Sequence, residues 1–280
     1  MSARNDDELE QNWAAETVTV DDGEDSDVEV EDDDEEDGEG GDAAVADDEV
    51  DAAQAKKRAR DPSTPTAEPA AKKKKPQKSM KGLQNMTQSE HFKIVNDVYA
   101  KLYGDNLTPL EIANGLVESH FATVPNFGKH NLDSLSRFLR SLCPKWKLLF
   151  KGKGIKDKKS PILLIVCSSA LRAVEVGKAI AVFKCHVAKL FAKHLKLSEQ
   201  VDNLKRFHPI AIGTPGRIKT LLEMKALSLE CTTHVVLDMY RDSKNMSILE
   251  LKDTAKDTVD CIREHMLPAL ASQSLSLALY

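Results

Sequence analysis

Short apolar runs alternate with helical segments along the second half of the chain. In the first run, over 161–166, apolar residues follow one another without alternating with polar ones. This pattern predicts a strand buried on both faces, as in a parallel sheet. Between the runs, apolar residues recur every three or four positions, which predicts helices. The expected strands are 161–166, 187–191, 209–213, 234–237 and 275–279, and the expected helices are 173–183, 198–206, 214–222 and 248–266. This order predicts βαβ units and an α/β fold with a mainly parallel sheet between helices.

The part of the chain before these runs is predicted to be helical. Apolar residues are spaced by three and four over 92–102 and again over 132–142, with Ser89 as the expected N-cap of the first helix. Thr108-Pro109-Leu110-Glu111 has the sequence of a capping box with proline at the first helical position, so another helix is expected to start there. We therefore expect residues 85–280 to form one domain, a helical lead-in followed by a three-layer α/β unit.

Charge is distributed unevenly over the 280 residues. Residues 1–51 contain 24 acidic side chains and one basic side chain, whereas residues 52–280 contain 21 acidic and 38 basic ones, so the two parts have net charges of −23 and +17. Residues 1–84 have too few apolar side chains to offset the cost of ordering a chain, roughly 1–2 kcal/mol per residue, and are expected to form a disordered tail, first acidic and then basic. An acidic tail on a basic remainder indicates nucleic acid or basic proteins as partners.

Two basic clusters lie in the second half of this tail. A spacer rich in proline and threonine separates them, and together they resemble a bipartite nuclear import signal. We therefore expect a nuclear protein. The basic residues of the two clusters are Lys56, Lys57, Arg58, Arg60, Lys72, Lys73, Lys74, Lys75 and Lys78.

Several classes of protein are disfavoured by composition. No stretch approaches 18 consecutive apolar residues, and the first residues lack the apolar core of a secretory signal, so neither a membrane partner nor secretion is expected. The five cysteines are 18 to 46 residues apart without a Cys-x-x-Cys pair, which is typical of free thiols. The histidines also lack the short spacing of a zinc site, and no metal site is expected.

The most informative stretch is Ile210–Ile218, which reads Ile-Ala-Ile-Gly-Thr-Pro-Gly-Arg-Ile and is followed by Val235-Val236-Leu237-Asp238. Thr214 is suited to cap a helix with its hydroxyl, Gly216 lets a backbone approach closely, and Arg217 would project from a helix N-terminus, which attracts anions. The stretch resembles the first RecA-like half of the DEAD-box RNA helicases, in which these residues hold the RNA backbone. A plain helix start with a solvated arginine is the alternative interpretation.

A second segment also matches that helicase family. Cys167–Arg172 takes the place of the family's Pro-Thr-Arg-Glu-Leu-Ala, although the family's arginine is lost. The resemblance makes Ser168 and Ser169 candidate phosphate contacts beside Thr214, Gly216 and Arg217.

The residues that hydrolyse ATP in the helicases do not follow the pattern here. A phosphate-binding loop needs Gly-x-x-x-x-Gly-Lys followed by serine or threonine. The Gly-Lys pairs are at 128–129, 152–153 and 177–178, and none of them has both a glycine five residues earlier and a serine or threonine directly after it. The acidic box is Asp238-Met239-Tyr240-Arg241, which keeps one possible metal ligand and loses the glutamate that positions water. Because phosphoryl transfer needs the metal, the lysine and the positioned water together, we expect no enzyme and no cofactor.

Five segments stand in an order that resembles the Cms family of small-ribosomal-subunit assembly proteins. They are Cys143–Trp146, Cys167–Ala170, Leu190–His194, Gly213–Ile218 and Arg241-Asp242. The resemblance covers residues 140–280, and the tail matches by composition. It implies a nucleolar protein on early small-subunit precursors, with pre-rRNA and ribosome-assembly proteins as partners and no small-molecule substrate. The alternative is a chaperone that uses its acidic tail to bind basic nuclear proteins.

Overall fold

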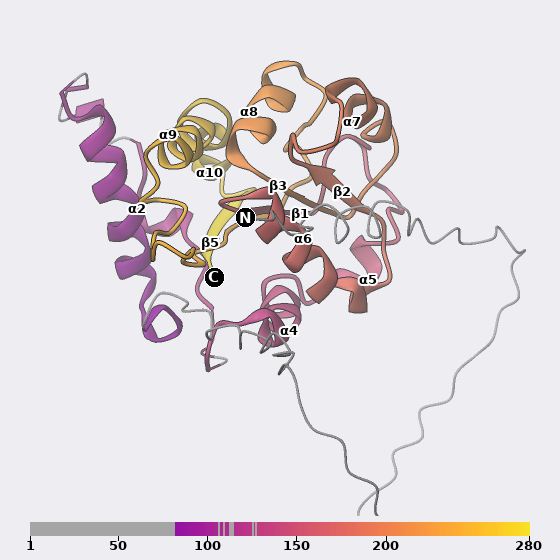
Figure 1. Ribbon diagram of the computed structural model, residues 1–280, viewed down its shortest axis with the longest axis horizontal. Coiled ribbons are helices and arrows are strands. Elements are labelled where there is room, and N and C mark those ends of the chain that lie inside the picture. The colour runs from indigo at the N-terminus through magenta and orange to yellow at the C-terminus, as the bar shows by residue number, and fades with distance from the viewer. Residues whose placement is uncertain (1–81, 106, 109, 112–114, 125, 127) are drawn as a thin grey trace, which may run out of the picture. The chain divides into compact units, whose positions relative to one another are not determined.

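A five-stranded sheet lies at the centre of the computed structural model, which describes residues 82–105, 107–108, 110–111, 115–124, 126 and 128–280 (Figure 1). All four pairs of neighbouring strands are parallel. In spatial order the strands are β2 (Val187–Leu190), β3 (Ile210–Gly213), β1 (Leu163–Val166), β4 (His234–Leu237) and β5 (Ser276–Leu279). Both β1 and β3 are buried at every position, which explains why their sequences are apolar without alternation.

Helices cover both faces of this sheet. On one face Leu164 and Val166 of β1 join a hydrophobic cluster with α2 (Gln88–Tyr103), α7 (Leu197–Asn203), α8 (Pro215–Glu223), α9 (Lys252–Cys261) and α10 (Leu267–Ala271). On the other face Leu163 and Ile165 join a second cluster with α4 (Leu132–Leu142), α5 (Trp146–Leu149) and α6 (Ala170–Ala179). Figure 1 shows α7, α8 and α9 above the sheet and α4, α5 and α6 below it. The predicted three-layer α/β fold with a mainly parallel sheet is confirmed.

The N-terminal lead-in differs from the prediction at its first cap. Thr87, not Ser89, is the N-cap of α2: its backbone N–H donates to Oε2 of Glu90 at 2.6 Å, and the N–H of Glu90 donates to Oγ1 of Thr87 at 3.3 Å. This reciprocal pair satisfies two helix-end donors, which Ser89 cannot do because Phe92 stands three residues after it. A short 3₁₀ turn, η1 (Leu83–Asn85), precedes α2, and Leu83 is buried in the core.

Two further expected elements have distinct outcomes. The capping box at Thr108 is confirmed, since the N–H of Thr108 donates to Oε2 of Glu111 at 2.7 Å, although much of the segment after it lies outside the described residues. The single helix expected over 248–266 is wrong. Ile248 lies in a turn, α9 begins at Lys252, and the chain continues through a π-helical stretch, η4 (Ile262–Met266), into α10. Pro268 lacks the N–H that an uninterrupted α-helix would use there.

Two short 3₁₀ turns complete the described elements, η2 (Glu118–His120) and η3 (Ala181–Phe183). The acidic segment and both basic clusters of the tail, residues 56–60 and 72–78, lie outside the described residues, so the import signal stays a prediction. Within the part of the chain that the structure describes, no helix combines the length and apolarity needed to cross a bilayer.

Candidate functional site

The carboxyl ends of the parallel strands meet at one edge of the sheet, which is where open α/β sheets bind their ligands. A backbone hydrogen bond from Cys167 to the carbonyl of Gly213, at 2.8 Å, ties the ends of β1 and β3 together. The structure thus brings the predicted site residues to this edge. They follow three neighbouring strands: Ser168 and Ser169 after β1, Thr214, Gly216 and Arg217 after β3, and Asp238 after β4.

Arg217 lies in the first turn of α8 and is half-buried. Its Nη1 donates to Oε1 of Gln200 at 3.1 Å. Gln200 is itself buried, and its Nε2 donates to the carbonyls of Lys189 and Phe191, each at 2.9 Å. Gln200 therefore holds the guanidinium against the end of β2. A guanidinium has five N–H donors, so this contact positions Arg217 while leaving donors for a phosphate.

Thr214 is the N-cap residue of α8 by position, but its hydroxyl accepts no hydrogen bond from the helix, so the predicted side-chain cap is wrong. Its backbone N–H donates to the carbonyl of Leu190 at 3.0 Å instead. Pro215 occupies the first helical position as expected, and its ring removes one of the N–H groups that a cap would satisfy. Gly216 faces α9, where an added Cβ would lie 2.8 Å from Oδ2 of Asp257.

The two serines after β1 lie at the start of α6. Ser169 is exposed and is the N-cap, since its Oγ accepts from the N–H of Arg172 at 3.2 Å. Ser168 is half-buried beside it. Both hydroxyls keep a proton to donate, which a phosphate oxygen accepts.

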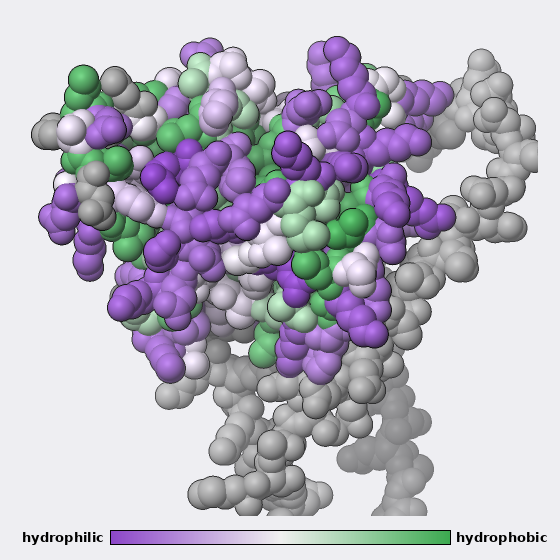
Figure 2. Space-filling model, turned by 90° about the horizontal axis from the view of Figure 1, so that it is seen from above, coloured by the Kyte–Doolittle hydropathy of each residue, from purple (hydrophilic) through white to green (hydrophobic). Residues whose placement is uncertain are grey.

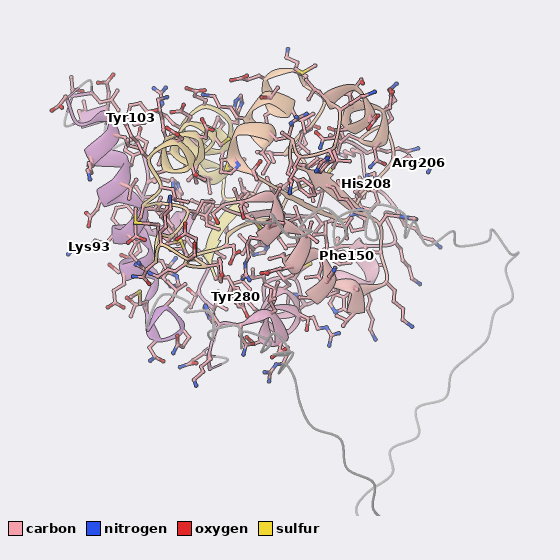
Figure 3. All side chains as sticks on the ribbon, in the orientation of Figure 1. Lys93, Tyr103, Phe150, Arg206, His208 and Tyr280 are labelled. Carbon is pink, nitrogen blue, oxygen red and sulfur yellow. The ribbon has the colours of Figure 1, made fainter. Side chains whose placement is uncertain are left out.

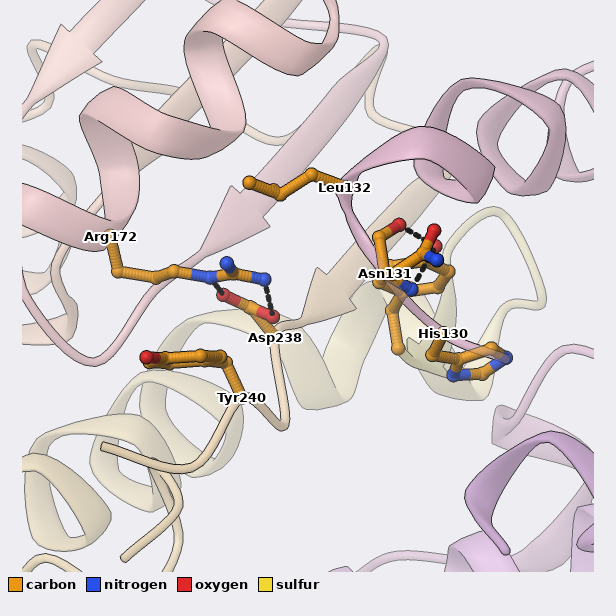
Figure 4. Close-up of a pocket in the computed structure, with 7 residues that line it drawn as sticks. His130, Asn131, Leu132, Arg172, Asp238 and Tyr240 are labelled. Carbon is orange, nitrogen blue, oxygen red and sulfur yellow. Dashed lines mark hydrogen bonds and ion pairs between the residues drawn. The ribbon is translucent and has the colours of Figure 1, made fainter. Parts of the chain in front are cut away.

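Asp238 is closed off by a partner that the sequence analysis missed. Its Oδ2 accepts from Nε of Arg172 at 2.6 Å and its Oδ1 from Nη2 at 3.2 Å (Figure 4). Both side chains are buried, with 6% of Arg172 and 3% of Asp238 exposed. The ring of Tyr240 covers the guanidinium at 4.2 Å, and Glu175 accepts from its Nη1 at 3.2 Å.

The charges of this pair support each other. Burial raises the pKa of Asp238, while the attraction and hydrogen bonds of Arg172 oppose that rise. Burial disfavours the charged form of Arg172, but the nearby Asp238 outweighs it and raises the pKa of the guanidinium. The two-point contact is the geometry of an ionised pair, so we take both groups as charged. Asp238 cannot ligate a metal without breaking this contact.

A single-residue bridge, a loop and a helix adjoin the ion pair. Phe121 forms a parallel bridge to Leu277 of β5, and the N–H of Ala122 donates to the same Leu277 carbonyl at 2.7 Å. The chain then passes through Gly128 and Lys129 into α4. Strand, Gly-Lys loop and helix is the order of a phosphate-binding loop. The Gly-Lys pair at 128–129 could not be placed after a strand from the sequence, because a single bridged residue leaves no strand pattern.

The N-terminus of α4 is closed by the protein's own groups. The N–H of Ser134 donates to Oδ1 of Asn131 at 2.9 Å, and the N–H of Asn131 contacts the hydroxyl of Tyr280 at 3.2 Å. That hydroxyl also donates to the carbonyl of Asn131 at 2.6 Å. His130 follows Gly128-Lys129 where a phosphate-binding loop has serine or threonine, and its ring stacks on Tyr280 at 4.3 Å. Two of the N–H donors that would meet a phosphate, those of Asn131 and Ser134, therefore have partners within the protein.

A small pocket remains between this loop and the ion pair. Its volume is about 50 Å³. Sites for ligands of drug size typically measure roughly 300–1,000 Å³, so this pocket suits water and not a nucleotide. It is lined by His130, Asn131, Leu132, Arg172, Asp238, Tyr240 and Tyr280 (Figure 4).

One group of potential metal ligands occurs within the described residues, away from this edge. It consists of Glu223, Glu264 and His265. The carboxylate of Glu264 is already paired with Arg263 at 2.7 Å and lies 3.8 Å from Nζ of Lys219. Because two cations already surround this carboxylate, we assign no metal to the group.

His130 predicts a specific loss of stability in acid. Burial lowers its pKa to about 4, and its Nδ1 is buried without a hydrogen-bond partner. The unfolded chain binds this proton below about pH 6.5, the folded chain only below about pH 4, so stability falls as the pH falls through that window. Since the ring is only partly buried, we expect His130→Phe to lessen the loss of unfolding free energy between pH 7 and pH 5 by about 1 kcal/mol. Urea unfolding at both pH values measures it, and an equal loss in both proteins would contradict the assignment.

The family model described as CMS1, U3-containing 90S pre-ribosomal complex subunit, matches residues 43–280. The chain belongs to this family. The predicted resemblance to the Cms proteins is thereby confirmed. Protein CMSS1 of Xenopus laevis is 37% identical over 182 residues, which cover 62% of this chain and 65% of the relative. Protein CMSS1 of Homo sapiens is 38% identical over 151 residues, which cover 52% of this chain and 53% of the relative. The matches to these two family members thus span less than two thirds of their length.

A fission yeast member of the family is more distant. Protein cms1 of Schizosaccharomyces pombe is 28% identical over 195 residues, covering 67% of this chain and 68% of the relative. Among solved structures, a DEAD box protein from the hyperthermophile Methanococcus jannaschii is similar over 48% of this chain and 35% of that chain, with 17% identity and a TM-score of 0.32.

Proposed function

We propose that the chain is a non-enzymatic subunit of pre-ribosomal particles that binds RNA in the nucleolus during assembly of the small ribosomal subunit. The observation that carries this proposal is the family match over residues 43–280, since the family is described as a subunit of the U3-containing 90S pre-ribosomal complex. Other ribosome-assembly proteins are the partners that such membership implies. The two basic clusters of the tail fit import into the nucleus.

The carboxyl edge of the sheet supports RNA as a ligand. Arg217 is held in place by Gln200, and the hydroxyls of Thr214, Ser168 and Ser169 lie on the neighbouring strand exits. Guanidinium and hydroxyl donors on strand ends and helix starts suit phosphate oxygens and carry no base specificity by themselves. We therefore assign these residues, with Gly216, to the RNA backbone.

The same edge supports the absence of catalysis. Asp238 is bound to Arg172 through both oxygens, and Met239 stands where the helicases have the glutamate that positions water. At the helix start after Gly128-Lys129, the N–H groups of Asn131 and Ser134 donate to side chains of the protein itself. Phosphoryl transfer requires a metal ion, a lysine clamp and an ordered water in one place, and this arrangement favours none of the three.

Binding of the full-length chain to a pre-rRNA fragment tests the proposal. Arg217→Gln is expected to weaken binding roughly fivefold to tenfold and to reduce the salt dependence by about one unit of slope, because one phosphate contact is lost. Arg137→Gln is the matched control, since Arg137 is exposed on α4, on the opposite face of the sheet from α8. Fluorescence anisotropy over a range of salt concentrations measures both quantities.

Two results would count against the proposal. Equal affinities of the Arg217 and Arg137 variants would remove the role given to the carboxyl edge. The alternative is a chaperone that binds basic nuclear proteins through its acidic tail, and the charge of −23 on residues 1–51 supports it. This alternative would be favoured if the chain has no affinity for RNA and if deletion of residues 1–51 abolishes its binding to basic nuclear proteins.

A further inference from the structure

A dense group of lysines lies on the connection between α5 and β1. Seven lysines occur within residues 145–159, all of them exposed, and Asp157 is the only acidic residue among them. Lys205 and Arg206, exposed between α7 and β3, join the group. We call this surface the lysine face: Lys145, Lys147, Lys151, Lys153, Lys156, Lys158, Lys159, Lys205 and Arg206.

Two glycines and an aromatic contact shape the backbone of the lysine face. Gly152 and Gly154 have φ values of +66° and +81°, which side chains other than glycine rarely adopt, and so give the connection defined turns. Gly152 lies so close to Phe207 that an added Cβ would be 2.7 Å from the ring, which joins the two segments of the face. At one end Trp146 packs on Phe183, with ring centroids 5.0 Å apart. Figure 3 shows Phe150, Arg206 and His208 on the same side of the molecule, far from Lys93.

The lysine face lies at the opposite end of the sheet from Arg217. The α5–β1 connection enters the amino end of β1, and Arg206 lies just before the amino end of β3. Arg217 and the ion pair of Asp238 follow the carboxyl ends of the strands. In parallel strands these two ends are at opposite edges, so a ligand on the lysine face does not depend on the carboxyl edge.

The positive charge of this face is largely uncompensated. Among the described residues, Lys205 pairs with Asp202 at 2.6 Å, and Lys159 donates to the carbonyl of Lys225 at 3.2 Å. No ion pair to a described residue is formed by the lysines at 145, 147, 151, 153, 156 or 158. Figure 2 shows hydrophilic side chains over much of the neighbouring face formed by α7, α8 and α9. Clustered lysines are point charges that attract a polyanion through its phosphates without reading bases.

We propose that the lysine face binds the phosphate backbone of RNA, so that the chain holds RNA at both edges of its sheet. The inference rests on the proposed function in taking RNA as the polyanion. The acidic residues 1–51 are the competing occupant, and the experiment treats them as an outcome. RNA is favoured because its closely spaced phosphates hold condensed counterions, which exposed lysines release on binding, and this strengthens binding at low salt.

The test compares two triple variants of the full-length chain with equal loss of charge. Lys151→Gln/Lys153→Gln/Lys156→Gln removes the centre of the lysine face. Lys93→Gln/Lys101→Gln/Lys252→Gln removes three exposed lysines on α2 and α9. The probes are a 20-base-pair RNA duplex and a 20-nucleotide single strand, which separate helical from single-stranded RNA as the source of phosphate. Melting temperatures confirm that both variants are folded.

We expect the lysine-face variant to bind at least one probe about tenfold more weakly at 0.1 M salt, with a salt slope reduced by two to three units, and the control to stay within about twofold. Adding Arg217→Gln should multiply the losses, because the two edges are separate. Equal losses in the two triple variants would overturn the inference. Unchanged or tighter RNA binding by the lysine-face variant would also overturn the inference, and would indicate that the acidic residues 1–51 occupy the lysine face. If the wild-type chain binds neither probe, both the proposed function and this inference are wrong. If Arg217→Gln weakens binding and the lysine-face variant does not, the proposed function stands and the inference about the lysine face is wrong.

Discussion

Arg172→Met is expected to lower the free energy of unfolding by about 3–5 kcal/mol, because it leaves the carboxylate of Asp238 buried without a neutralising positive charge. Both oxygens of Asp238 are bonded to this one guanidinium, and only 3% of the residue is exposed. Urea unfolding followed by tryptophan fluorescence measures the loss. A buried ion pair deprived of one member is among the few changes that destabilise a domain by this much.

The double variant Arg172→Met/Asp238→Leu is the control for this prediction. Replacing both charges by apolar side chains removes the unpaired carboxylate, so the double variant should recover most of the loss. Glu175→Gln alters the same cluster at its half-exposed rim and should stay within about 1 kcal/mol. A single Arg172 variant as stable as the wild type would show that the pair does not close the site in solution.

Gly213→Ala is expected to destabilise the domain by about 3 kcal/mol or more. Gly213 ends β3, and a Cβ there would lie 2.2 Å from the carbonyl oxygen of Leu190 and 2.6 Å from its Cβ on β2. Since the obstacle is the backbone of a paired strand, relief requires that β2 and β3 separate, which exceeds the usual 1–3 kcal/mol of an overpacked core. Thermal unfolding by circular dichroism measures the change.

Gly216→Ala is the matched control in the same segment. Its Cβ would meet the carboxylate of Asp257 at 2.8 Å, the far end of a side chain that can rotate away, and alanine favours the helix. We expect a change within about 1 kcal/mol. Similar losses for the two glycine variants would contradict the distinction. The expected difference indicates that the first glycine of Gly-Thr-Pro-Gly-Arg is needed for the packing of β3 against β2. The second glycine belongs to the surface that we propose for RNA.

The sheet was predictable because its strands are short apolar runs separated by helical segments. The five strands lie where the runs stand, and the first turn of α8 begins at Pro215 as its sequence indicates. The helix boundaries near 248–268 were not predictable from periodicity, because the apolar stripe continues through the turn before α9 and through the π-helical stretch. Ile248 is buried in the hydrophobic core although it lies in a turn, so its apolar character does not indicate a helix.

The candidate site was predictable in part. The motif at 213–217 and the serines at 168–169 meet at one edge because they follow neighbouring strands. Two contacts were missed. The contact of Gln200 with Arg217 joins two separate elements, and Arg172 acts through Asp238, which is far away in the sequence. A basic residue just after one buried strand and an acidic residue just after another is the signal that indicates such a pair.

The ion pair between Arg172 and Asp238 has a consequence for how such a subunit would be regulated. If the ion pair fills the cleft as we propose, a small ligand there adds no stability, and cellular nucleotide levels do not enter the folding equilibrium of the domain. If it acts as proposed, its residence on a particle is set by macromolecular affinities alone. Its release then depends on remodelling of the particle by other factors, and not on nucleotide hydrolysis by the chain itself.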